Sequence, residues 1–126
     1  MAGGIIDMLA VGSGSFLGGV ARYAVGRVLQ AHATGPFPWG TLAVNIGGCL
    51  LIGILYGLID KGMPGSGSVR LFLTAGFCGG FTTFSTFMRE SGELLGGPAP
   101  WLAILYAGVS LALGLGALYL GQLITR

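Results

Sequence analysis

Four stretches of this chain are long enough to cross a lipid bilayer as helices and contain almost no charged residue. These windows cover about residues 5–29, 39–59, 69–95 and 101–125. A helix needs about 20 apolar residues to cross the hydrocarbon core, and only helices and closed barrels can satisfy their backbone hydrogen bonds there. We therefore expect an all-α integral membrane protein, with residues 1–126 forming a single domain of four transmembrane helices.

The charge content excludes most soluble classes of protein. Only 8% of the residues are charged, whereas a soluble domain carries roughly 25%. A hydrophobic content of 53% excludes a disordered chain, and a net charge of +2 without a basic cluster argues against a nucleic-acid-binding protein. The sequence has no phosphate-binding loop, dinucleotide fingerprint, metal cluster or Ser-His-Asp pattern. With one histidine and four peripheral carboxylates, we do not expect an enzyme.

Glycine makes up 26 of the 126 residues. In lipid, small residues let helices approach one another closely, and glycine also weakens a helix from within. We expect the first role, close helix contact, for Gly14, Gly18, Gly53 and Gly57. We expect the second role, a break in the third helix, for Gly76, Gly79 and Gly80.

The basic residues are divided almost evenly between the two sides of the membrane. Four spans place both termini on one side, because their number is even. That side carries Lys61, Arg70 and Arg126, and the other side carries Arg27 and Arg89, with Arg22 deeper in its span. Because such differences orient membrane proteins, the near balance permits insertion in both orientations and an antiparallel homodimer. A fixed orientation set by the weak bias is the equal alternative.

The most informative segment is GGFTTFSTF, residues 79–87, in the third span. Its density of hydroxyl residues after paired glycines argues against a continuous helix. Unwound backbone at membrane depth is tolerated only where it is buried in protein or lines a cavity. The freed carbonyls can then bind a cation, and the following half-helix can attract an anion with its N-terminus. The alternative is a close-packed helix whose hydroxyls bond back to the preceding turn.

Other polar or aromatic residues within the spans are further candidates for function, because polar groups are costly in lipid. The Asn45 amide can donate to an anion, or it can hold two helices together. Phe84 and Phe87 lie three apart and can turn their positive ring edges toward a small anion, or they can simply pack. Tyr106 and Ser110 lie four apart and can add hydroxyl donors, or they can bond within their own surroundings.

The charged residues within and near the spans also have expected positions and roles. Arg22 either extends to the near interface or draws anions toward a vestibule. Asp7, Glu90 and Glu93 lie near span ends, and we expect them to be solvated. A proton-coupled exporter normally needs a carboxylate at mid-span as its relay. The lack of one counts against a small multidrug exporter, which otherwise matches in length, span count and antiparallel assembly.

Two motifs resemble the signatures of the Fluc (CrcB) fluoride channel family. They are GTLAVN, residues 40–45, and GGFTTFSTF, residues 79–87, and the resemblance extends over essentially the whole chain. It implies a dual-topology, antiparallel homodimer with a broken third helix and two fluoride pores. It also implies passive, fluoride-selective export of cytoplasmic fluoride across the inner (plasma) membrane, which would give fluoride resistance.

The resemblance also implies roles for individual residues. By motif match, the fluoride pore is implied to comprise Asn45, Phe84, Phe87, Thr41, Ser85, Tyr106 and Ser110, with Arg22 in the vestibule. A structural Na⁺ at the dimer interface is implied to bind the backbone carbonyls of Gly79 and Thr82. Family members often continue the line of hydroxyls along the fourth span, where this chain has Gly114 and Leu118 instead.

The physical chemistry of fluoride agrees with that implication. Fluoride is small and strongly hydrated, so a pore must replace its water with donors that do not trap it. Neutral amides, hydroxyls and ring edges meet this need without a fixed cation. Two alternatives remain: a small proton-coupled exporter of cationic organic compounds, and a non-transporting assembly subunit packed through glycine motifs.

Overall fold

The computed structural model describes residues 2–126, and every regular element in that range is helical. The first, second and fourth spans are α1 (Ala2–Ala31), α2 (Trp39–Asp60) and α6 (Trp101–Ile124). The third span consists of four consecutive pieces: α3 (Gly67–Leu71), the π-helix η1 (Phe72–Cys78), α4 (Gly79–Phe81) and α5 (Ser85–Leu95). All four spans are long and apolar enough to cross a membrane, which confirms the expected all-α class.

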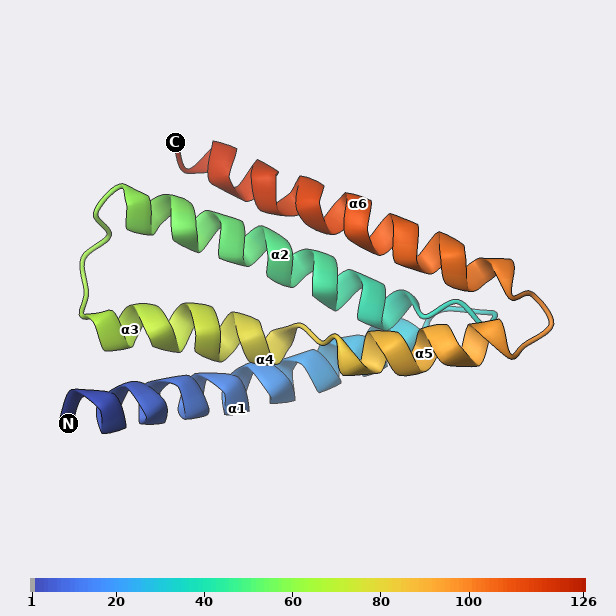
Figure 1. The fold of residues 1–126 in the computed structure, drawn as a ribbon, viewed down its shortest axis with the longest axis horizontal. Helices are drawn as coiled ribbons and strands as arrows, with labels where there is room; N and C mark the ends of the chain where they lie inside the picture. Colours follow the sequence, from blue (N-terminus) through green and yellow to red (C-terminus); the bar gives the residue numbers. More distant parts are fainter. Residues whose placement is uncertain (1) are drawn as a thin grey trace.

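The spans lie side by side in an up-and-down arrangement, with both ends of the chain at the same end of the bundle (Figure 1). In this view α2 lies between α6 and the third span, and α1 lies on the other side of the third span. The main contacts follow that order, because α2 packs chiefly against α6 while α1 packs against η1 and α4. Two of the connections turn at Gly35 and Gly62, both at φ +85°, a conformation that glycine adopts without strain.

Glycines bring the helices into backbone contact. A Cβ at Gly14 would clash with the carbonyl oxygen of Phe72, and one at Gly18 would clash with the carbonyl oxygen of Phe77. On the other side of the bundle, a Cβ at Gly53 would clash with the carbonyl oxygen of Leu118. Such close approach is the role of small residues between membrane helices. The expected packing role of these glycines is therefore confirmed.

The expected role of Gly76 and Gly80 as helix breakers is wrong. A Cβ at Gly80 would lie 2.5 Å from the carbonyl oxygen of Ser15, and one at Gly76 would lie 3.1 Å from the Cα of Gly14. These two glycines therefore admit α1 against the third span. The break comes after them, because the helix ends at Phe81 and Thr82 has an extended backbone with φ −98° and ψ 160°.

Candidate functional site

The break in the third helix is held open by the side chain of Asn45 on α2. The Asn45 Nδ2 donates to the Thr83 carbonyl at 3.1 Å, and the Thr83 N–H donates to Asn45 Oδ1 at 2.8 Å. In a continuous helix the Thr83 N–H would bond the Gly79 carbonyl four residues earlier. A side chain from a neighbouring helix has therefore replaced part of the backbone ladder of the third span.

The hydroxyl of Thr83 replaces a second backbone acceptor of the third span. The Thr86 N–H donates to Thr83 Oγ1 at 3.3 Å, although a continuous helix would direct it to the Thr82 carbonyl. Within residues 2–126, the carbonyl oxygens of Gly79 and Thr82 therefore receive no hydrogen bond. These are the two carbonyls for which the resemblance implied a cation.

A cavity of about 460 Å³ lies beside the break, and we name it the break cavity. Its lining includes Asn45, Thr83, Phe84, Phe87 and Ser110, five polar or aromatic residues from α2, the break, α5 and α6. No acidic or basic side chain belongs to the lining formed by the described part of the chain. The cavity therefore offers dipoles and ring edges without a fixed charge.

The aromatic residues beside the break meet edge to face. The ring centroids of Phe84 and Phe87 lie 6.0 Å apart with an angle of 61° between the planes. Phe87 and Tyr106 lie 4.8 Å apart at 77°. In such pairs the positive edge of one ring meets the negative face of another. Phe84 is 69% exposed, so its ring is the one most available to a neighbouring ion or protein chain.

The Ser110 hydroxyl is an unsatisfied side-chain group in the lining of the break cavity. Its oxygen is buried and finds no hydrogen-bond partner among residues 2–126. Because a buried hydroxyl normally has a partner, this one is available to a ligand in the cavity. The next residue along that face of α6 is Gly114, which is buried, and a Cβ there would lie 3.5 Å from the Cys49 sulfur. The line of hydroxyls on α6 therefore ends at Ser110.

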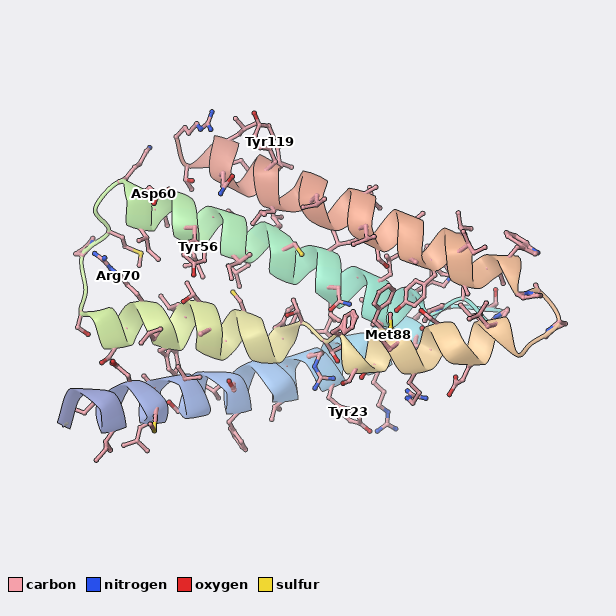
Figure 2. All side chains as sticks on the ribbon, in the orientation of Figure 1. Tyr23, Tyr56, Asp60, Arg70, Met88 and Tyr119 are labelled. Atoms are coloured by element: carbon pink, nitrogen blue, oxygen red, sulfur yellow. The ribbon has the colours of Figure 1, made fainter. Side chains whose placement is uncertain are left out.

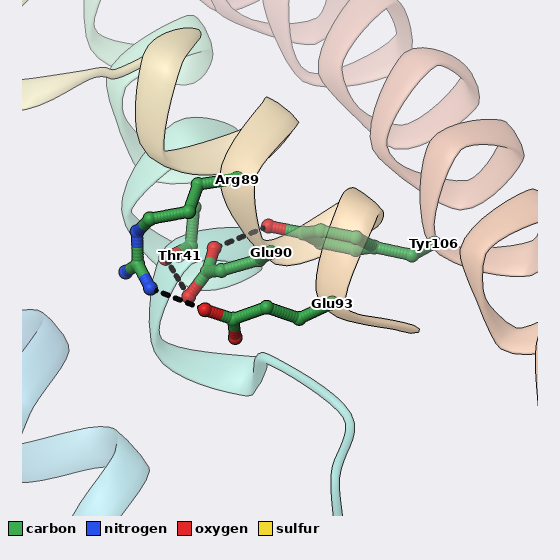
Figure 3. Close-up of polar contacts among 5 residues, drawn as sticks. All are labelled: Thr41, Arg89, Glu90, Glu93 and Tyr106. Carbon is green, nitrogen blue, oxygen red and sulfur yellow. Dashed lines mark hydrogen bonds and ion pairs between the residues drawn. The ribbon is translucent and has the colours of Figure 1, made fainter. Parts of the chain in front are cut away.

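The other two predicted hydroxyls converge on a carboxylate that we had expected to be solvated. Thr41 Oγ1 donates to Glu90 Oε2 at 3.0 Å, and the Tyr106 hydroxyl donates to Glu90 Oε1 at 3.1 Å (Figure 3). Tyr106 is fully buried, and Glu90 is half-buried. The expectation for Glu90 is therefore wrong, because α2 and α6 each bring a hydroxyl to its carboxylate.

Asp7 and Glu93, which we had also expected to be solvated, differ in their contacts. Asp7 accepts a hydrogen bond of 2.8 Å from the Ser68 hydroxyl, which connects α1 to α3. Glu93 is exposed and pairs with Arg89 at 2.7 Å, one helical turn away (Figure 3). An exposed pair of this kind contributes little to stability. Glu93 thus behaves as a surface residue, whereas Asp7 has a specific partner.

A second cavity, of about 280 Å³, lies among α1, α2 and α5, and we name it the arginine cavity. Arg22, Arg27 and Arg89 contribute to its lining, and Tyr23, labelled in Figure 2, marks its position on α1. The Arg22 Nε donates to the Gly80 carbonyl at 3.0 Å, so Arg22 is anchored to the third span and not extended freely to the interface. Thr83 contributes to the lining of both cavities.

The predicted pore residues thus occupy three places. Asn45, Phe84, Phe87 and Ser110 line the break cavity, and Thr41 and Tyr106 bind Glu90. Ser85 is exposed at the first position of α5 and lines neither cavity. The residue that the sequence analysis missed is Glu90. Its spacing of three from Phe87, which places both on one helix face, was the available signal.

The fold and the two cavities define a small four-span membrane protein whose third helix is broken beside an uncharged cavity. The model of the family described as "CrcB-like protein, Camphor Resistance (CrcB)" matches residues 9–122. The chain therefore belongs to the CrcB family, and it is a multi-pass membrane protein.

Curated relatives match the chain over nearly its whole length. A protein of Chlorobaculum tepidum named "Fluoride-specific ion channel FluC" is 46% identical over 120 residues, which cover 95% of this chain and 94% of the relative. A protein of Beijerinckia indica with the same name is 44% identical over 124 residues, covering 95% and 96%. Another of that name, from Chlorobium chlorochromatii, is 47% identical over 119 residues, covering 94% and 92%.

Proposed function

We propose that this protein is a fluoride-selective channel that exports cytoplasmic fluoride passively and so gives fluoride resistance. The observation that carries the proposal is the break cavity, which presents an amide, hydroxyls and aromatic rings and no charged side chain from the described chain. The printed name of the relatives, fluoride-specific ion channel, supports the same function. The localisation that fits this function is the inner membrane of the cell.

The two cavities suggest a route for the ion. Fluoride first meets the arginine cavity, whose positive charge raises the local anion concentration. Thr83, which lines both cavities, marks the passage to the break cavity. There the ion exchanges its water for neutral donors, which hold it more weakly than a guanidinium would and so permit it to leave.

Two donors in the break cavity are free to meet the ion. Asn45 uses one amide hydrogen on the Thr83 carbonyl, and its second hydrogen remains, because an amide NH₂ carries two. The Ser110 hydroxyl has no partner among residues 2–126. The edges of Phe84 and Phe87 complete the surroundings with partial positive charge. Thr41, Tyr106 and Ser85 also belong to the proposed pore, and membership of the CrcB family supports their inclusion.

The functional unit in this proposal is an antiparallel homodimer with two pores. Irregular backbone at membrane depth is stable only when protein or a water-filled cavity covers it, and here the break carries the 69% exposed Phe84 beside the exposed Ser85. A second copy packed on this region would cover it. The nearly even division of basic residues between the two sides suits a chain that inserts in both orientations.

A structural Na⁺ at the dimer interface is part of the same proposal. The carbonyls of Gly79 and Thr82 have lost their helical donors and are free to coordinate a hard cation, as unwound carbonyls do in membrane transporters. A Cβ at Gly79 would meet nothing within 4 Å, so the backbone there is accessible to a second copy and an ion. The positive charge of the bound Na⁺ would link the broken third helices of the two subunits.

The experiment that tests the function is fluoride efflux from proteoliposomes, followed with a fluoride electrode. Fluoride loss with retention of chloride supports a fluoride channel, and equal loss of both ions contradicts it. The alternative, a small proton-coupled multidrug exporter, requires proton-dependent uptake of a cationic compound and no fluoride flux. Replacing Na⁺ by a large organic cation during purification should lower the fraction of dimer if the proposed Na⁺ site exists, and an unchanged dimer would contradict that site.

A further inference from the structure

The lining of the arginine cavity contains more basic than acidic side chains. Three guanidinium groups, those of Arg22, Arg27 and Arg89, share the lining with one carboxylate, that of Glu90. Both oxygens of that carboxylate already accept hydroxyl hydrogen bonds, from Thr41 and Tyr106. The lining therefore has an excess of positive charge whose donors are not matched by acceptors.

Most of the guanidinium donors around this cavity are free. Arg22 donates through Nε alone, and Arg27 makes no hydrogen bond with any of residues 2–126. Arg89 donates through Nη1 to Glu93, but both partners of that pair are 64% exposed, so water and salt weaken it. A planar guanidinium matches two acceptor oxygens of one group at once. Fluoride, a single atom, cannot use that geometry.

We propose that the arginine cavity binds a tetrahedral oxyanion of the phosphate or sulfate type. Paired oxygens at the correct spacing engage the forked donors of Arg27 and Arg89 in charge-assisted hydrogen bonds, and Arg22 lines the same cavity. The volume of about 280 Å³ exceeds the size of a halide ion and accommodates a polyatomic anion. The cavity thus has a ligand chemistry different from that of the break cavity.

Two sources can supply this oxyanion. One is soluble phosphate or sulfate on the side of the membrane where the cavity opens. The other is the phosphate of an anionic lipid, because Arg27 is exposed near the end of its span, where basic residues meet lipid headgroups. In either case the bound group lies next to Thr83, which the break cavity shares. Resting on the proposed function, we infer that occupancy slows fluoride flux.

The test measures binding by thermal unfolding of the dimer in an uncharged detergent, so that it does not depend on fluoride transport. Sodium sulfate and sodium phosphate are compared with sodium chloride at equal ionic strength, and phosphatidylglycerol is compared with phosphatidylcholine in mixed micelles. The variants are Arg27→Gln and Arg27→Lys. The first removes both the positive charge and the paired N–H donors of the guanidinium, and the second keeps the charge and removes only the paired donors. Lys61→Gln, at the opposite end of the bundle, is the matched control for charge.

We expect sulfate, phosphate or phosphatidylglycerol to raise the unfolding temperature of the wild type above that in chloride or phosphatidylcholine. Arg27→Gln should weaken the apparent affinity about tenfold, because a charge-assisted hydrogen bond is lost, and Arg27→Lys should also weaken it. Lys61→Gln should respond as the wild type does. A response to the lipid alone identifies the headgroup as the source.

Two results would overturn the site. One is an equal shift by chloride, and the other is an Arg27→Gln variant that responds like Lys61→Gln. A fluoride efflux that sulfate or anionic lipid leaves unchanged would overturn the inferred slowing of flux, while the unfolding data decide the site itself.

Discussion

Asn45 and Thr83 hydrogen-bond each other in both directions, with the amide nitrogen 3.1 Å from the Thr83 carbonyl oxygen and the Thr83 nitrogen 2.8 Å from the amide oxygen. This exchange connects α2 to the break in the third helix. It takes a backbone donor away from the Gly79 carbonyl, and the same Asn45 side chain belongs to the lining of the break cavity. One side chain therefore serves both the architecture of the break and the chemistry of the proposed pore.

Replacing Asn45 by Asp keeps the acceptor for the Thr83 N–H and removes the donor to the Thr83 carbonyl. It also places a carboxylate in a cavity whose described lining has no charge. Because like charges repel strongly where water is scarce, we expect fluoride efflux to fall by more than about tenfold. Fluoride efflux from proteoliposomes measures this change.

The control for that variant is Asn45→Ala, which removes both hydrogen bonds without adding a charge. It should destabilise the fold by about 1–3 kcal/mol, because the backbone groups of Thr83 lose their partner. Normal flux through Asn45→Asp would refute the role of this amide in the pore.

Replacing Phe84 or Phe87 by Ile keeps an apolar side chain of moderate size and removes the ring edges. Loss of an aromatic contact worth about 1 kcal/mol or more should slow fluoride about tenfold. The proposed dimer should survive, as judged by size-exclusion chromatography. Phe16→Ile is the matched control, because Phe16 lies on α1 and is 70% exposed, away from the break cavity. If all three variants conduct equally, the two rings do not line the pathway.

Replacing Glu90 by Ala should leave the hydroxyl of the fully buried Tyr106 without its acceptor. An unsatisfied buried hydroxyl costs about 1–3 kcal/mol, so the unfolding temperature should fall. The unfolding temperature of Glu90→Gln should fall less, because the amide oxygen still accepts a hydrogen bond from one hydroxyl. Glu93→Ala should be nearly neutral, since its ion pair with Arg89 is exposed. Equal melting of the Glu90→Ala and Glu93→Ala variants would show that the contacts of Glu90 carry no stability.

Replacing Gly14 by Ala should separate α1 from the third span, because the new Cβ would clash with the carbonyl oxygen of Phe72. Overpacking of this kind costs about 1–3 kcal/mol. Gly12→Ala, two residues earlier on the same helix, meets nothing within 4 Å, and it should be neutral or slightly stabilising. Thermal unfolding in detergent compares the two variants, and similar unfolding temperatures would contradict the backbone contact.

The spans and the break were predictable from the sequence because both rest on local properties. A sufficiently long stretch of apolar, uncharged residues indicates a membrane helix. The hydroxyl residues within residues 82–86 indicate irregular backbone. The cause of the break was not predictable. It depends on Asn45, which reaches the Thr83 backbone from another helix, and such contacts between distant residues leave no local pattern.

The misassigned residues show the same limit. Gly80 was expected to break the helix because glycine weakens helices, but its lack of a side chain instead admits the backbone of Ser15. Glu90 was expected in water because it lies near a span end, but Thr41 and Tyr106 arrive from two other helices to bind it. In both cases the tertiary contact, and not the residue type, decides the role.

The measurement that tests the central claim most directly is the efflux of two anions from the same vesicles. Proteoliposomes are loaded with equal concentrations of fluoride and chloride, and an electrode for each ion follows its release. The account predicts rapid loss of fluoride while chloride is retained, because the neutral donors of the proposed pore replace the water of the smaller ion. Release of both ions at the same rate, or retention of both, would contradict it.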